Sequence, residues 1–184
     1  MKSIVLCGTF VLLGFVCSYA RGGEVDLSVV QNIEVDRYFG TWYEIARFDN
    51  ALERNLDRVT AEYLKNPDGT VTIINRGYKP NGKQWSAEGT IRLPPPPVEG
   101  KFKAVYFLWF SMTYYILELD TEDYAYALVG SSSPDYLWIL SRTPTLPREV
   151  LDRLLQRARE RGFDVSRLYY CDQTGPNPQA STSL

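Results

Sequence analysis

The stretch Gly40-Thr41-Trp42-Tyr43-Glu44-Ile45-Ala46-Arg47 decides the fold of this chain. Its residues alternate with a period of two, which is typical of a strand whose two faces meet different surroundings. The set that we expect to face the interior is Trp42, Glu44, Ala46 and Phe48. Gly40 permits a tight turn at the start of the strand, and Trp42 can fill the closed end of a small barrel. A Gly-x-Trp step alone also fits the first strand of any β domain.

The rest of the chain continues in strands at hairpin spacing. The strand candidates are 41–49, 58–65, 70–79, 84–93, 101–108, 113–120, 124–131 and 136–142. Because they follow one another without long crossover connections, we predict an all-β fold, an eight-stranded antiparallel up-and-down β-barrel. Residues 35–39 fit a short helical turn at its floor. Residues 147–161 fit one C-terminal α-helix whose apolar stripe packs on the outside of the barrel.

A second stretch, Asp135-Tyr136-Leu137-Trp138-Ile139-Leu140-Ser141-Arg142, fits a last strand that ends in an arginine. Together the two stretches closely resemble the lipocalin family, in the branch of the bacterial outer-membrane lipocalins and apolipoprotein D. Gly40 and Trp42 match the first motif of the family, Asp135 and Tyr136 the second, and Arg142 the third. The resemblance covers residues 33–171. It implies that Arg142 lies across the Trp42 ring and closes one end of the barrel.

The composition excludes several classes of protein. The chain has no histidine, which removes Ser-His-Asp and Cys-His nucleophile systems and histidine-ligated zinc or haem. Its net charge is −2 and it has no basic stripe, so we expect no nucleic-acid partner. No P-loop, G-x-G-x-x-G or C-x-x-C motif appears, and we expect neither a metal nor a cofactor. Aromatic residues reach 14%, which fits the ordinary preference of strands or an aromatic-lined cavity.

The two ends of the chain differ in character from its middle. Residues 1–20 have a short positive start, an apolar core and a small-x-small cleavage site, which predicts a signal peptide and export to the periplasm or the extracellular space. Residues 21–34 are expected to form a leader segment, and 35–171 the barrel with its helix. Residues 172–184 are small and polar, and we expect a disordered tail there.

Cysteine usage gives two further expectations. Cys17 suggests a lipid anchor of the kind that bacterial members of the family often carry. The three residues before it, Gly14-Phe15-Val16, lack the leucine and the small residue of a lipobox, so we do not expect an anchor. After cleavage Cys171 is the lone cysteine of the mature chain. It is either an inert thiol buried where the tail packs back, or a thiol that stays free or pairs between molecules.

Alternation and the resemblance together identify a candidate lumen. Alternation places Tyr63, Asn75 and Trp138 on the interior face of their strands. The resemblance implies that these three residues line the pocket together with Phe107 and Tyr114. The full set of expected ligand-binding residues is Ala46, Phe48, Tyr63, Asn75, Lys79, Phe107, Tyr114 and Trp138. Each position alone also fits a packed core, but aromatic walls with a few polar groups favour an amphipathic lipid over a sugar.

The segment 102–112 is apolar on both faces in its second half, so its alternation fails there. In the resembling family this hairpin lies at the open mouth of the barrel. The residues that we expect to form an exposed rim are Leu108, Trp109, Phe110 and Met112. Such a patch is typical of a membrane surface, a partner or a ligand portal. Burial of the segment under a neighbouring loop is the alternative.

These observations favour a non-enzymatic carrier or store of a fatty acid, a lysophospholipid or a similar amphipathic lipid. The acyl chain would lie in the lumen, and Lys79 would meet a carboxylate or phosphate at the mouth. We expect a monomer or a homodimer with peripheral membrane contact. Two alternatives remain: a lipid or isoprenoid isomerase that uses a tyrosine or Glu44, and a partner-binding module that acts through the rim. Turnover indicates the first alternative, and capture of a partner without lipid binding indicates the second.

Overall fold

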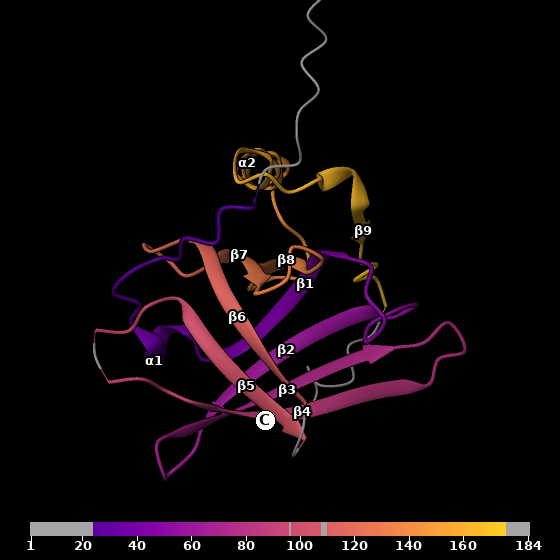
Figure 1. Ribbon diagram of the computed structural model, residues 1–184. Helices are drawn as coiled ribbons and strands as arrows, with labels where there is room; N and C mark the ends of the chain where they lie inside the picture. Colours follow the sequence, from indigo (N-terminus) through magenta and orange to yellow (C-terminus); the bar gives the residue numbers. More distant parts are fainter. Residues whose placement is uncertain (1–23, 96, 108–109, 176–184) are drawn as a thin grey trace, which may run out of the picture.

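The computed structural model describes residues 24–95, 97–107 and 110–175 (Figure 1). The predicted signal peptide lies outside these residues, as does most of the predicted tail. The elements in chain order are α1 (Val35–Tyr38), β1 (Gly40–Phe48), β2 (Asp57–Lys65), β3 (Thr70–Tyr78), β4 (Gln84–Arg92), β5 (Lys101–Phe107), β6 (Phe110–Leu119), β7 (Tyr126–Ser131), β8 (Leu137–Ser141), α2 (Arg148–Glu160), the 3-10 helix η1 (Val165–Arg167) and β9 (Leu168–Tyr170).

The predicted eight-stranded antiparallel barrel is confirmed. Strands β2 to β8 pair in sequence order, β8 pairs with β1, and β1 pairs back with β2, which closes the sheet. Closure satisfies the edges that an open sheet would expose. The short strand β9, which the sequence analysis did not predict, pairs with the last three residues of β1. It returns the C-terminal segment to the barrel wall.

A bulge in β1 changes which residues face the interior. The register of β1 against β8 shifts between Glu44 and Ala46, and one extra residue in a strand reverses its alternation. Trp42 packs in the cluster inside the barrel, but Ala46 and Phe48 pack in a second cluster, with residues of α2. The prediction that Ala46 and Phe48 line the lumen is therefore wrong.

The hydrophobic core has two layers, one on each face of the barrel wall. The inner layer fills the closed end around Trp42, which is fully buried. The outer layer lies between the wall and α2. In Figure 1, α2 lies above β7 and β8. In β8 the two layers alternate residue by residue, since Trp138 and Leu140 belong to the inner one and Leu137 and Ile139 to the outer one.

Helix α2 covers the outside of the barrel, as its apolar stripe predicts. Leu154, Leu155 and Ala158 are its buried residues. The helix ends in a Schellman motif, because Gly162 has a φ of +91° and the N–H of Phe163 donates to the carbonyl of Ala158 at 3.0 Å. Within the part of the chain that the structure describes, we find no helix with the length and apolarity to cross a membrane.

Hydrogen bonds hold the segments that precede and follow the barrel in the sequence. In the leader, the N–H of Val30 donates to the carbonyl of Ile116 at 2.9 Å. At the other end, Asp172 and Gln173 lie in the predicted disordered tail. The carbonyl of Asp172 accepts from the N–H of Arg58 at 2.8 Å, and the Gln173 side chain donates to the carbonyls of Glu44 and Val59. The chain is thus ordered beyond the predicted barrel boundary at residue 171.

Candidate functional site

Trp42 and Arg142 close one end of the barrel, as the resemblance implied. The guanidinium carbon of Arg142 lies 3.9 Å from the centroid of the Trp42 ring. Arg142 also donates to the carbonyls of Arg37, Thr41 and Tyr124 at 2.7, 3.0 and 3.2 Å. Gly40 has a φ of +90°, and a Cβ atom there would lie 3.6 Å from Arg142 Nη1. This floor therefore needs the glycine, the tryptophan and the arginine of the motifs together.

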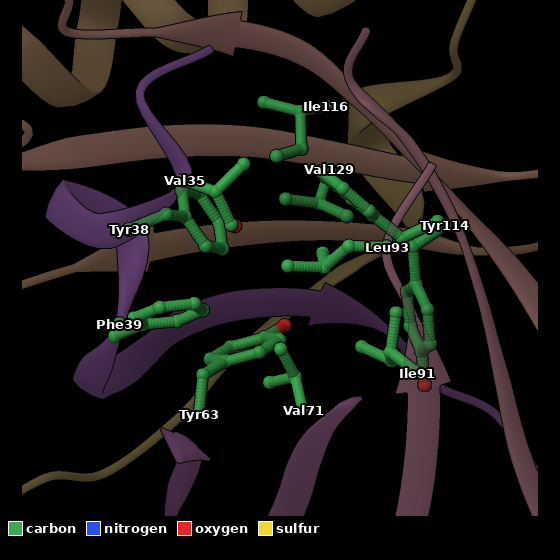
Figure 2. Close-up of a pocket in the computed structure, with 11 residues that line it drawn as sticks. Val35, Tyr38, Phe39, Tyr63, Val71, Ile91, Leu93, Tyr114, Ile116 and Val129 are labelled. Carbon is green, nitrogen blue, oxygen red and sulfur yellow. The ribbon is translucent and has the colours of Figure 1, made fainter. Parts of the chain in front are cut away.

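Aromatic and branched side chains fill the lumen next to this floor. Figure 2 shows Tyr38, Phe39 and Tyr63 pointing into the same space as the aliphatic side chains of the wall. The free volume there is about 20 Å³, and the adjoining space beside Glu44 and Asn75 has about 30 Å³. Volumes of this size hold one or two water molecules. The deep part of the lumen is therefore a packed core in this conformation.

A hydrogen-bonded bar of polar side chains crosses the lumen above this core. Asn75 Nδ2 donates to the Tyr106 hydroxyl at 2.9 Å, and the hydroxyls of Tyr106 and Tyr114 are 2.6 Å apart. Burial raises the pKa of the Tyr114 hydroxyl, so the bar is uncharged at neutral pH. It offers hydroxyl and amide groups to a ligand that reaches this level.

A cavity of about 460 Å³ lies on the other side of the bar, toward the mouth of the barrel. Its wall is formed by Ala51, Leu52, Glu53, Asn75, Trp85, Ser86, Ala87, Tyr106, Phe110, Met112, Tyr114 and Trp138. This volume falls in the range of small-molecule sites, which are mostly apolar with a few polar groups. Since Glu53 is the acidic member of this wall, it gives the cavity a polar point of attachment among aromatic surfaces.

The loop between β1 and β2 carries Glu53 into the cavity wall. Glu53 Oε2 accepts hydrogen bonds from the Trp138 indole Nε1 at 3.0 Å and from Asn50 Nδ2 at 2.7 Å. Asn50 Oδ1 in turn accepts from the backbone N–H groups of Leu52 and Glu53. Glu53 is 8% exposed, which is low for a carboxylate. The loop therefore holds the carboxylate in a fixed position.

A buried charged cluster lies behind the cavity. Arg47 Nη1 is 2.7 Å from Glu44 Oε1, and both side chains are almost fully buried. Burial raises the pKa of Glu44 to about 8, with a further upward contribution from the Glu53 carboxylate and an opposing one from Arg47. The other terminal nitrogen of Arg47 donates to the carbonyls of Glu53 and Leu56 at 2.7 and 3.0 Å. Arg47 thus ties the loop to the strand.

The thiol of Cys171 completes this cluster. Its Sγ lies 2.9 Å from Glu44 Oε1 and 2.9 Å from Arg47 Nη1. Burial, followed by the Glu44 carboxylate, raises the pKa of the thiol. The result agrees with the expectation of an inert thiol at the point where the chain packs back, since a protonated thiol is a poor nucleophile.

The structure brings together four of the residues that the sequence predicted for the lumen. Tyr63, Asn75, Tyr114 and Trp138 all line its spaces. Lys79 does not, because it lies exposed in the turn after β3. The expectation that Lys79 meets the head group of a ligand at the mouth stays a prediction. The expectation for Phe107 concerns a side chain outside the described structure.

The predicted exposed rim is corrected in part. Met112 is buried, and both it and Phe110 belong to the cavity wall. The inward placement follows from β6, whose first residues pair with β5 and whose alternation continues through Met112 to Tyr114. Leu108 and Trp109 lie outside the described residues.

The two residues of the second motif lie in different surroundings. Asp135 is exposed and forms an ion pair with Arg167, in which the carboxylate oxygen and the guanidinium nitrogen are 3.1 Å apart. Tyr136 stacks on Trp138, with the ring centroids 5.7 Å apart. Tyr136 therefore supports a wall residue of the cavity, while Asp135 ties the start of β8 to the segment after α2.

Sequence reasoning missed three residues of the site. Tyr106 follows Phe102 and Ala104 at alternate positions, so simple alternation would have placed it in the lumen. Glu53 has only a local signal, the Asn-x-x-Glu spacing of a capping turn. Arg47 is displaced to the interior by the bulge. No cluster of three or more potential metal ligands occurs within residues 24–95, 97–107 and 110–175.

Comparisons with known proteins agree with this geometry. Residues 33–173 match a family model described as a lipocalin-like domain. The outer membrane lipoprotein Blc of Vibrio cholerae is 43% identical over 174 residues, which cover 94% of this chain and 99% of that protein. Blc of Escherichia coli K12 is 44% identical over 150 residues, 81% of this chain and 84% of that protein. Lobster apocrustacyanin A1 has the same fold, with a TM-score of 0.64 at 22% identity over 80% of this chain and 83% of that one.

Proposed function

This chain belongs to the lipocalin family, and we propose that it binds and carries or stores a small amphipathic lipid, such as a fatty acid or a lysophospholipid. The observation that carries the proposal is the cavity of about 460 Å³ between the tyrosine bar and the mouth. Trp85, Tyr106, Phe110 and Met112 give it the apolar wall that an acyl chain requires. The floor at Trp42 is closed, so the ligand enters and leaves through the mouth.

Burial of the acyl chain supplies the affinity. Each methylene group that leaves water contributes about 0.8 kcal/mol. Eight buried methylenes therefore contribute roughly 6 kcal/mol, from which the cost of immobilising the lipid is subtracted. The tyrosine bar sets the depth that the chain reaches. A longer chain needs Tyr106 or Tyr114 to rotate and open the packed lumen beneath.

The similarity to outer membrane lipoproteins over nearly the whole chain supports an exported location associated with the outer membrane. An amphipathic lipid has low solubility in water, and a carrier at a membrane shortens its exposure. Peripheral contact of the mouth with a lipid surface would serve that transfer. Binding rather than catalysis is the role that the site supports, because the buried acid of the cluster, Glu44, is engaged by Arg47 and Cys171.

Titration of the purified chain with a single-chain lysophospholipid, followed by tryptophan emission, tests the proposal. Trp85 and Trp138 line the cavity, so a bound chain should change their emission to saturation at about one lipid per protein. Replacing Trp138 by alanine should remove part of the change and weaken the affinity. Absence of a saturable change contradicts the proposal. Conversion of the lipid to a product would instead indicate an enzyme.

A further inference from the structure

We propose that Glu53 selects the head group of the ligand. The mouth cavity would favour a single-chain amphiphile whose head carries a hydrogen-bond donor or an ammonium group over one whose head is a carboxylate. The inference rests on the proposed function and adds the chemical class of the ligand. It reverses the expectation from the sequence that a lysine meets an anionic head there.

The first support is the free oxygen of a buried carboxylate. Both side-chain hydrogen bonds that Glu53 accepts within the described chain end on Oε2, from Trp138 and Asn50. No described residue donates to Oε1. Glu53 is 8% exposed and belongs to the wall of the cavity. Oε1 is not among the fully buried, unpartnered side-chain atoms of the described chain, so it keeps some exposure and a donor group of a ligand in the cavity can reach it.

The second support is the charge of the lumen wall. Glu44 and Glu53 are the acidic residues that line the cavity and the space beneath it, and the raised pKa of Glu44 leaves Glu53 as the source of negative charge at neutral pH. Among the described residues, no lysine or arginine lines either space. Arg47 lies close by but lines neither space; Glu44, Cys171 and two backbone carbonyls engage its terminal nitrogens, and its Nε, which has no partner, is fully buried. A ligand carboxylate would therefore be buried beside Glu53 without a cation to compensate it.

The third support is the rigidity of the loop. Asn50 fixes the backbone of the loop through the N–H groups of Leu52 and Glu53, at 3.0 and 3.2 Å. Arg47 holds the carbonyls of Glu53 and Leu56 from below. The carboxylate is therefore ordered before the ligand arrives. Preorganised groups discriminate between ligands better than mobile ones, because the protein loses less entropy on binding.

The test compares three amphiphiles with the same twelve-carbon chain: dodecylammonium, the uncharged monoacylglycerol of dodecanoic acid, and dodecanoate. Each is titrated below its micelle concentration at about pH 7.5, where the fatty acid is ionised. Tryptophan emission reports binding. We expect dodecylammonium and the monoacylglycerol to bind the unmodified protein at least about tenfold more tightly than dodecanoate, a difference of about 1.4 kcal/mol.

Glu53→Gln removes the charge and keeps an acceptor for the Trp138 indole. It should lower the affinity for dodecylammonium and raise the affinity for dodecanoate, so that the two affinities come within about threefold of each other. Glu88→Gln is the matched control, because Glu88 is exposed on β4 and lies outside the cavity wall. It makes the same change in net charge and should leave the tenfold preference intact.

The outcomes separate the two proposals. Equal affinities for all three amphiphiles in the unmodified protein overturn the role of Glu53, while the lipid-binding function stands. That role is also overturned if Glu53→Gln folds and retains the preference, or if dodecanoate binds most tightly. Should Glu53→Gln fail to fold, the order of affinities in the unmodified protein decides. If none of the three binds, the proposed function itself fails.

Discussion

Replacing Arg142 by alanine should lower the free energy of unfolding by about 2–4 kcal/mol. The cation–π contact with Trp42, at 3.9 Å from the ring centroid, contributes about 0.5–1 kcal/mol at a half-buried site. The side chain also donates to three backbone carbonyls, of Arg37, Thr41 and Tyr124. Each such bond contributes about 0.5–1 kcal/mol, because water replaces the donor where the floor is partly exposed. Together these contributions give the stated range.

Thermal and urea unfolding followed by circular dichroism measure this loss. For a chain of this size, 2–4 kcal/mol lowers the melting temperature by roughly 5–12 °C. Arg142→Lys should lose less than Arg142→Ala, since it keeps the charge but not the planar fork of donors. Arg148→Ala is the control, because Arg148 lies exposed and its ion pair is with Asp152 on the same helix. It should change the stability by less than about 0.5 kcal/mol.

Equal melting temperatures for Arg142→Ala and Arg148→Ala would refute this account of the floor. Lipid affinity gives an independent check. Neither Trp42 nor Arg142 lines the mouth cavity. The packed part of the lumen separates this pair from the cavity. Arg142→Ala should therefore leave the affinity for a single-chain lipid nearly unchanged at a temperature where the variant is folded. A parallel loss of affinity and stability would mean that the two ends are coupled.

Trp138→Ala should weaken lipid binding by about tenfold or more in a fluorescence titration, whereas Tyr43→Ala, outside the lumen, should not. Phe110→Ser should also lower the affinity for a monomeric lipid, because Phe110 belongs to the cavity wall. Leu154→Ala, on the buried face of α2, should lower the free energy of unfolding by about 2–4 kcal/mol in urea. The pKa of Glu44 is raised from 4.5 to about 8, so the folded state retains a proton over that range. Stability should therefore fall as pH rises between these values, by at most about 1.4 kcal/mol per pH unit, and Glu44→Gln should flatten that slope.

The barrel could be predicted from the sequence because the patterns that indicate its strands and turns are local. Most strands alternate over several residues, and several turns contain glycine, proline or asparagine. The motif residues Gly40, Trp42 and Arg142 add a long-range contact that no local pattern contains, and the resemblance supplied it. The helix over 148–160 was equally predictable, since its apolar stripe has the helical period and Gly162 ends it.

The site was predicted less well, for reasons that lie in particular residues. One inserted residue in β1 reverses the alternation, so Ala46 and Phe48 were assigned to the wrong face and Arg47 was missed. A glycine marks one class of bulge, but residues 44–46 contain none, so the local sequence does not indicate this one. Glu53 reaches the lumen through a loop, and its partner Trp138 is far away in the sequence. Loop conformation depends on such distant contacts, which a single sequence does not display.

Lipid extraction from the protein purified from its native cells tests the central claim most directly. Mass spectrometry of the extract, calibrated against the protein, counts the lipid molecules per chain. The account predicts about one single-chain amphipathic lipid per chain, and clearly less in Trp138→Ala prepared in parallel. Absence of lipid from the unmodified protein, or equal amounts in both preparations, would contradict the claim that the cavity beside Trp138 is a lipid site.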